Sequence, residues 1–208
     1  MTSMYLKDLA FIQKKYIEDM FANEVCVITK ANKKIKYIYN GKVSKLSDIK
    51  PNPSHKNGYI YQVTKDIKFQ TKFGNFVEDE NGSVRENGYI IVGPLNEIYK
   101  AGNDLKQLEE KYERIGQVFK PKGEPLKAIK ITKLIFNNLK NSKLFSYRLG
   151  DKPGEDSKNG VIEFPVLYKG ENYGSVHVLQ INDYIMLDSA EFYRIYSKAF
   201  KITYDVEN

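Results

Sequence analysis

Apolar residues recur at helical spacing near the start of the chain. From Ser3 to Phe21 they fall on one face at about 100° per residue, and Ser3 is a good helix N-cap. A helix of this length is stabilised mainly by packing, so we expect its apolar face, which also includes Leu6 and Ile17, to be buried against a sheet or a partner subunit. The residues whose burial we predict are Tyr5, Leu9, Ile12, Tyr16 and Met20.

Short β-rich runs predict strands in the next part of the chain. Asn-Gly dipeptides accompany them, and Asn-Gly favours hairpin turns because Gly adopts positive φ without steric cost and Asn tolerates it. These dipeptides begin at Asn40, Asn57, Asn81, Asn87 and Asn159. The predicted strands are 25–29 and 35–39, joined as a hairpin, then 59–63, 67–76 and 89–92, with an acidic hairpin tip at 78–82.

Helical spacing returns after Gly93-Pro94. One helix is predicted from Asn103 to Gly116 and another from Leu126 to Asn141, with a breaker between them that contains two prolines and a glycine, Lys120 to Pro125. The last part of the chain is predicted to contain strands at 145–149, 161–168 and 174–181, a helix that follows a capping box at 188–191, and an edge strand at 201–204.

These elements predict an α+β fold. The strands occur in clusters rather than in strict β-α-β units, which argues against a doubly wound parallel sheet. We expect antiparallel sheets built from Asn-Gly hairpins, an N-terminal amphipathic helix, two central helices and a short C-terminal helix. The change of pattern near residue 100 predicts two lobes, 1–100 and 101–208, although a chain of 208 residues also fits one compact domain.

Composition indicates a soluble globular protein, since 41% of the residues are apolar and 28% are charged. The apolar runs are far shorter than the roughly 20 residues that span a bilayer, and Lys7 and Asp8 interrupt the region where a signal peptide would need an apolar stretch. We therefore expect a cytoplasmic or virion-associated protein that does not bind membranes. The lone Cys26 argues against an internal disulfide and predicts a small buried side chain.

The net charge of +7 is unevenly distributed. Residues 101–150 contain eleven Lys and Arg against five Asp and Glu, whereas residues 151–208 contain six against ten. Such asymmetry is typical of a nucleic-acid-binding face or of complementary patches on neighbouring subunits. An AT-rich genome, which favours Lys, Asn and Tyr, accounts for the composition equally well.

The sequence lacks a strong catalytic or metal-binding motif. Its two histidines, His55 and His177, do not form a metal-binding pair, and neither a P-loop, a dinucleotide fingerprint nor a Gly-x-Ser-x-Gly elbow is present. Glu163, inside an apolar strand, and His177 are the residues on which an enzymatic function would rest. We predict no catalytic residue, no metal and no cofactor.

Two other groups of residues are candidates for binding. A basic stretch could contact phosphates or an acidic protein surface, although the scarcity of Arg disfavours base-edge readout, and its residues are Lys120, Lys122, Lys127, Lys130, Lys133, Lys140 and Arg148. Tyrosines in predicted strands could form a protein interface or stack on bases, and these are Tyr37, Tyr39, Tyr59 and Tyr61.

Two functional hypotheses follow. The first is a non-enzymatic binding or assembly protein, a component or accessory factor of a phage or other mobile element, that acts through protein–protein contacts or as a homo-oligomer. The second is a nonspecific nucleic-acid-binding protein that uses the basic stretch 120–148 to neutralise phosphates.

Overall fold

The structure of the protein is a computed structural model that describes residues 3–30, 35–52, 56–73, 76–167, 170–171, 176–188 and 190–207. The chain forms two compact units. Unit 1 contains Met1–Thr29 and Pro125–Asn208, and unit 2 contains Lys30–Glu124.

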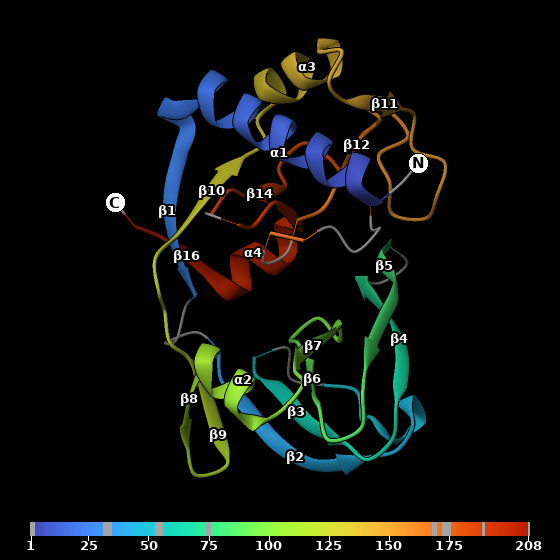
Figure 1. Cartoon of the computed structure of the whole chain (residues 1–208), viewed down its shortest axis with the longest axis vertical. Helices are drawn as coiled ribbons and strands as arrows, with labels where there is room; N and C mark the ends of the chain where they lie inside the picture. Colours follow the sequence, from blue (N-terminus) through green and yellow to red (C-terminus); the bar gives the residue numbers. More distant parts are fainter. Residues whose placement is uncertain are drawn as a thin grey trace. The chain divides into compact units, whose positions relative to one another are not determined.

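Unit 1 combines helices with two sheets (Figure 1). Its helices are α1 (Ser3–Met20), the short 3-10 helix η1 (Ala22–Glu24), α3 (Lys133–Asn141) and α4 (Ser197–Thr203). Its strands are β1 (Val25–Lys30), β10 (Leu126–Lys130), β11 (Ser146–Arg148), β12 (Val161–Pro165), β13 (Val176–Leu179), β14 (Tyr184–Met186), β15 (Tyr193–Ile195) and β16 (Tyr204–Val206).

The larger sheet of unit 1 has five strands in the order β15-β14-β10-β1-β16. β10 lies at its centre and pairs antiparallel with both β1 and β14, with Val25 opposite Ile129 and Ile129 opposite Ile185. Adjacent residues of a strand point to opposite faces of the sheet, and both Ala128 and Ile129 are fully buried. The sheet is therefore covered on both faces.

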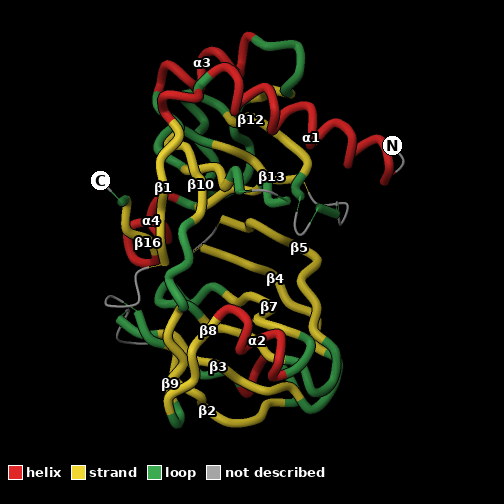
Figure 2. The backbone as a smooth tube through the Cα atoms, turned by 60° about the vertical axis from the view of Figure 1, so that its left-hand side comes forward, coloured by secondary structure: helices red, strands yellow, loops and turns green. Residues whose placement is uncertain are grey.

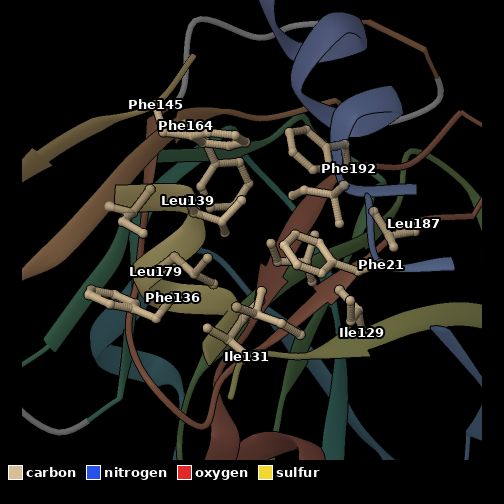
Figure 3. Close-up of a cluster of buried hydrophobic side chains, with 14 of the residues drawn as sticks. Phe21, Ile129, Ile131, Phe136, Leu139, Phe145, Phe164, Leu179, Leu187 and Phe192 are labelled. Carbon is tan, nitrogen blue, oxygen red and sulfur yellow. The ribbon is translucent and has the colours of Figure 1, made fainter. Parts of the chain in front are cut away.

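One face of this sheet lies under α1, α3 and the three-stranded sheet β11-β12-β13 (Figures 1 and 2). The largest core cluster of the protein lies there. Figure 3 shows Phe21, which directly follows α1, in the same cluster as Phe164 of β12 and Phe136 of α3. The rings of Phe164 and Phe192 are 5.0 Å apart and tilted, an arrangement that aromatic pairs favour.

The opposite face lies under α4. Phe200 of α4 stacks on Tyr184 of β14 with ring centroids 3.5 Å apart, and it also stacks on Tyr204 at 5.5 Å. The buried residues of this second cluster are Ile28, Ala128, Met186, Ile195, Phe200 and Tyr204.

Unit 2 is predominantly β-structure. Its helices are the 3-10 helix η2 (Leu46–Asp48) and α2 (Leu105–Lys111). Its strands are β2 (Tyr37–Val43), β3 (Gly58–Val63), β4 (Ile67–Phe73), β5 (Phe76–Val84), β6 (Tyr89–Val92), β7 (Ile98–Gly102), β8 (Tyr112–Ile115) and β9 (Val118–Pro121).

Six strands of unit 2 form one sheet in the order β7-β6-β3-β2-β9-β8, while β4 and β5 form a separate antiparallel pair. β2 and β3 run parallel, and the other neighbours in the six-stranded sheet pair antiparallel. Successive residues of β3 alternate between two core clusters, with Ile60 in one and Tyr61 in the other.

The α+β prediction is confirmed, since the structure combines four α-helices with mainly antiparallel sheets. The N-terminal helix is present at Ser3–Met20. The helix predicted for 103–116 ends at Lys111, and the one predicted for 126–141 begins only at Lys133, after the strand β10. The helix predicted after residue 188 begins only at Ser197, because residues 193–195 pair with β14 as strand β15.

One Asn-Gly dipeptide lies in a hairpin: Asn159-Gly160 ends the loop between the antiparallel neighbours β11 and β12, and Gly160 has a φ of 82°. Two others do not lie in turns. Asn40 and Asn81 lie inside β2 and β5, so the acidic segment 78–82 is part of a strand and not a hairpin tip. β1 and β2 do not pair either, since they belong to different sheets. Gly41, with a φ of 95°, lies where the register of β2 shifts. Asn87, with a φ of 66°, lies in the turn between β5 and β6, which belong to different sheets.

The division into units also differs from the predicted division at residue 100. Strands β8 and β9, which follow that point, pair with each other, and β9 pairs with β2. The hydrogen bonds of a sheet therefore keep residues 101–124 in unit 2. The predicted breaker at 120–125 begins inside β9 and ends where the two units divide.

Candidate protein-binding surface

The first helix does not bury the face that its apolar spacing predicts. Of the predicted face, only Ile17 is fully buried, and the other buried side chains of the helix are Ala10, Gln13 and Lys14. At 100° per residue the buried face is rotated by roughly 100° from the predicted stripe. The sheet therefore does not bury the whole stripe, and the alternative, burial against a partner subunit, stays a prediction.

Polar contacts hold the buried face of α1 in place. The Gln13 side chain, 1% exposed, donates a hydrogen bond of 2.6 Å from Nε2 to the carbonyl of Leu144. Lys14, 7% exposed, extends to Glu18 one turn further along the helix, with Nζ 2.7 Å from Oε1. The core thus contacts a mixed face of α1 and leaves a more apolar face outside.

The outward face carries large apolar side chains along the length of the helix. Tyr5, Ile12 and Met20 are 55%, 53% and 56% exposed, while Leu9 and Tyr16 are half-buried. We name the set Tyr5, Leu9, Ile12, Tyr16 and Met20 the α1 stripe. It extends over about 22 Å at 1.5 Å per residue. Tyr16 also packs on Phe145, at a ring distance of 6.1 Å, which anchors the middle of the stripe.

Charged residues border the α1 stripe on one side. Asp8, Lys15 and Asp19 are exposed and lie on the same flank of the helix. Lys15 pairs with Asp19 at 3.0 Å, whereas Asp8 forms no ion pair within the part of the chain that the structure describes. An apolar centre with a charged border is typical of protein interfaces.

The predicted basic stretch is divided between the two units. Lys120 and Lys122 belong to unit 2, whereas the remaining members belong to unit 1. Lys127 and Lys130 lie on β10, on opposite faces of the strand. The charge of the protein also divides unevenly, with eighteen basic and twelve acidic residues in Lys30–Glu124 against fifteen and fourteen in unit 1.

Only the helical part of the stretch forms a common face. Lys133 and Lys140 are two turns apart on α3, exposed, and without ion pairs among the described residues. Lys140 lies over the ring of Tyr147, with Nζ 3.9 Å from the ring centroid. Thr132 caps this helix, because its side chain accepts a hydrogen bond from the backbone N–H of Ile135 at 3.3 Å.

Arg148 is already neutralised by acidic side chains. Its guanidinium donates to Glu155 through both terminal nitrogens, at 2.6 and 2.8 Å. It also lies 2.7 Å from Asp151 and 2.7 Å from Glu163. Glu155 and Glu163 raise the pKa of Arg148, and the guanidinium in turn lowers the pKa of Glu155. The three carboxylates leave little positive charge for a phosphate.

The predicted tyrosine interface lies largely inside the protein. Tyr37 and Tyr61 are 5% and 2% exposed, and Tyr39 and Tyr59 are half-buried against the same core clusters. The Tyr61 hydroxyl accepts a hydrogen bond from the Asn40 side chain at 2.6 Å. Tyr37 and Tyr61 therefore stabilise the interior of unit 2 and cannot contact a partner.

Both enzyme candidates contact neighbouring side chains of unit 1. Glu163 pairs with Arg148, and His177 packs edge-on against Phe164 at a ring distance of 6.2 Å. Burial, together with the nearby positive charge of Arg194, lowers the pKa of His177 to about 3. A histidine with such a pKa is a weak base at neutral pH. His55 lies outside the described residues.

The buried ion pair of unit 1 has a structural role. Arg194 and Asp183 are both almost fully buried and lie 2.7 Å apart. The Asp183 carboxylate also accepts hydrogen bonds from the backbone N–H groups of Gln180 and Ser197, at 2.9 and 3.2 Å. It thereby connects the start of β14 to the start of α4.

Among the described residues, no group of three or more His, Cys, Asp and Glu side chains is placed to hold a metal ion. In the same residues, no helix is both long enough and apolar enough to cross a membrane.

Comparisons with protein-family models, curated proteins and solved structures give no match.

The sequence thus located the α1 stripe but left open whether a sheet or a partner subunit buries it. The width of the apolar arc is the sequence signal that part of the arc packs in the core while another part stays exposed. In the helical projection, the apolar arc has Ile12 at one edge and Phe21 at the other, and it is about 180° wide. A surface helix needs an arc of only roughly 100° to pack on the core.

His177 gives a prediction about acid stability. Its pKa is about 3 in the folded protein and about 6.5 when unfolded, so the unfolded state binds the proton first as the pH falls. We expect this group to remove about 1.4 kcal/mol of stability per pH unit between roughly pH 6 and 4. Urea unfolding of the parent and of His177→Gln across this range measures the contribution.

The difference between the two proteins should grow in favour of His177→Gln as the pH falls, and stay constant above about pH 7. If the unfolding free energies of the two proteins keep a constant difference across this pH range, the His177 ring takes up its proton as readily in the folded state as in the unfolded state.

Proposed function

We propose that the protein is a non-enzymatic binding or assembly protein that acts through protein–protein contacts made by the α1 stripe. The observation that carries this proposal is the exposure of Tyr5, Ile12 and Met20, each above 50%, on a helix that buries Gln13 and Lys14. Burying an apolar side chain contributes about 1.5–3 kcal/mol. A helix that leaves three of these side chains in water retains that free energy for association with a partner.

The stripe also has the composition of a binding surface. Tyr and Met are enriched at the centres of protein interfaces, and aromatic anchors contribute much of the binding free energy. Tyr5 and Met20 stand at the two ends of the stripe, with Ile12 between them. The neighbouring flank carries Asp8 and Lys15, which supply a polar border.

Photo-crosslinking in the producing cells tests this proposal. A benzophenone amino acid replaces Ile12, which is 53% exposed in the stripe, and in a matched variant it replaces Phe11, which is 42% exposed and points about 100° away. We expect discrete crosslinked products from position 12 and few from position 11. The mass of each product, with peptide identification, shows whether the partner is another copy or a different protein.

Equal crosslinking from the two positions would indicate random encounters, and an absence of products from position 12 would contradict a binding role for this face. Circular dichroism of both variants verifies that the helix is retained.

A second function, nonspecific binding of nucleic acid, is favoured by one observation. Lys130, Lys133 and Lys140 are exposed and form no ion pair among the described residues, and two of them share a face of α3. Lysines in this arrangement can neutralise phosphates without reading sequence.

Replacing Lys130, Lys133 and Lys140 by Glu should abolish retention on a DNA column at low salt, because each neutralised phosphate releases counterions. The matched variant replaces Lys198 and Lys201 of α4, which are also exposed, and should still be retained. Equal retention of the two variants, or none for the parent protein, would remove this function.

A further inference from the structure

We infer that the partner of the α1 stripe is a second copy of the same chain, with the two α1 helices packed antiparallel about a two-fold axis near Ile12. This inference rests on the proposed function and specifies its partner. The structure contributes two arguments, which are the symmetry of the stripe and the order of the charges beside it.

The stripe is nearly symmetric about its midpoint. Tyr5 and Met20 are its two most distant members and are similarly exposed, at 55% and 56%, while the half-buried Leu9 and Tyr16 lie between them and the centre. In an antiparallel pair, the start of one helix meets the end of the other. Tyr5 of one copy then reaches the level of Met20 of the other, and Leu9 reaches the level of Tyr16, so that large side chains face large side chains.

A two-fold axis also satisfies the requirement that an interface between identical chains be self-complementary. The same surface must serve as both partners. The α1 stripe meets this condition without any second surface on the molecule.

The charges on the flank distinguish antiparallel from parallel pairing. Asp8 and Lys15 lie two turns apart on the same side of the stripe and are both exposed. Equivalent flanks of two antiparallel helices face each other, so Asp8 of each copy lies near the level of Lys15 of the other. In a parallel pair, the two equivalent flanks lie on opposite sides of the interface, so Asp8 of one copy would not meet Lys15 of the other.

The ion pairs that Asp8 and Lys15 make within the chain are compatible with the antiparallel arrangement. Asp8 has no ion pair among the described residues, so its carboxylate is available to a cation of another molecule. Lys15 pairs with Asp19 at 3.0 Å on the exposed surface, a contact that contributes little and can be exchanged.

The size of the stripe predicts weak association. A single helix face of about 22 Å buries less surface than the roughly 1,200 Å² of a standard interface, so we expect a concentration-dependent dimer rather than an obligate one.

Charge reversal tests the inference. Sedimentation equilibrium from about 1 µM to about 1 mM should show a monomer–dimer equilibrium of the full chain. Of the flank residues Asp8, Lys15 and Asp19, Asp8→Lys leaves two positive and one negative, and Lys15→Glu leaves three negative. Each variant alone should therefore dimerise roughly tenfold more weakly than the parent. An equimolar mixture of the two should form heterodimers about as well as the parent forms homodimers, because opposite charges then face each other at both sites.

Native mass spectrometry identifies the heterodimer by its mass. Lys198→Glu, a reversal on the exposed face of α4, is the control and should dimerise like the parent. Because Asp8 and Lys15 are exposed, both variants should retain the thermal stability of the parent to within about a degree or two.

Each other outcome overturns the inference in a distinct way. A parent that dimerises, but whose mixed variants do not recover, pairs through another surface or in parallel. A parent that remains monomeric to about 1 mM does not pair with itself. In that case, crosslinking of position 12 to a different protein would leave the proposed function standing, whereas an absence of crosslinks would remove both.

Discussion

The five-stranded sheet of unit 1 is apolar on both faces, and this constraint determines how the rest of the unit is arranged. Its central strand β10 buries Ala128 on one face and Ile129 on the other, so each face needs a cover. α4 covers the first face through the stacking of Phe200 on Tyr184. α1 covers the second face together with α3 and the small sheet (Figures 1 and 2). Within unit 1, α1 is an outer layer: one face packs inward, and the opposite face remains for solvent or for another molecule.

The element types were largely predictable, whereas their ends and pairings were not. α1 was predicted because its spacing is regular over 18 residues, and period is the most reliable signal for a long helix. The segment 126–141 was read as one helix because β10, buried on both faces, has no alternation that would distinguish it from a buried helix. Asn-Gly dipeptides alone do not locate the hairpins, because the same positive-φ geometry also serves a register shift, as at Gly41.

The candidate surface was only half predictable. The sequence shows which residues of α1 are apolar, but its apolar arc is wide enough for the core to use either half. The choice depends on long-range contacts, such as the hydrogen bond from Gln13 to Leu144 and the pair of Tyr16 with Phe145, which join positions more than 120 residues apart. The same limit explains Arg148, whose charge was predicted but whose three carboxylate neighbours were not.

The measurement that tests the central claim most directly is the free energy of unfolding of two variants of α1 in dilute solution. Ile17 is fully buried and Ile12 is 53% exposed, although both belong to the same helix and are the same residue type. We expect Ile17→Ala to lose about 2–5 kcal/mol and Ile12→Ala to change by less than about 0.5 kcal/mol. A large loss for Ile12→Ala with little loss for Ile17→Ala would show that the core uses the α1 stripe itself, and would contradict its assignment as a binding surface.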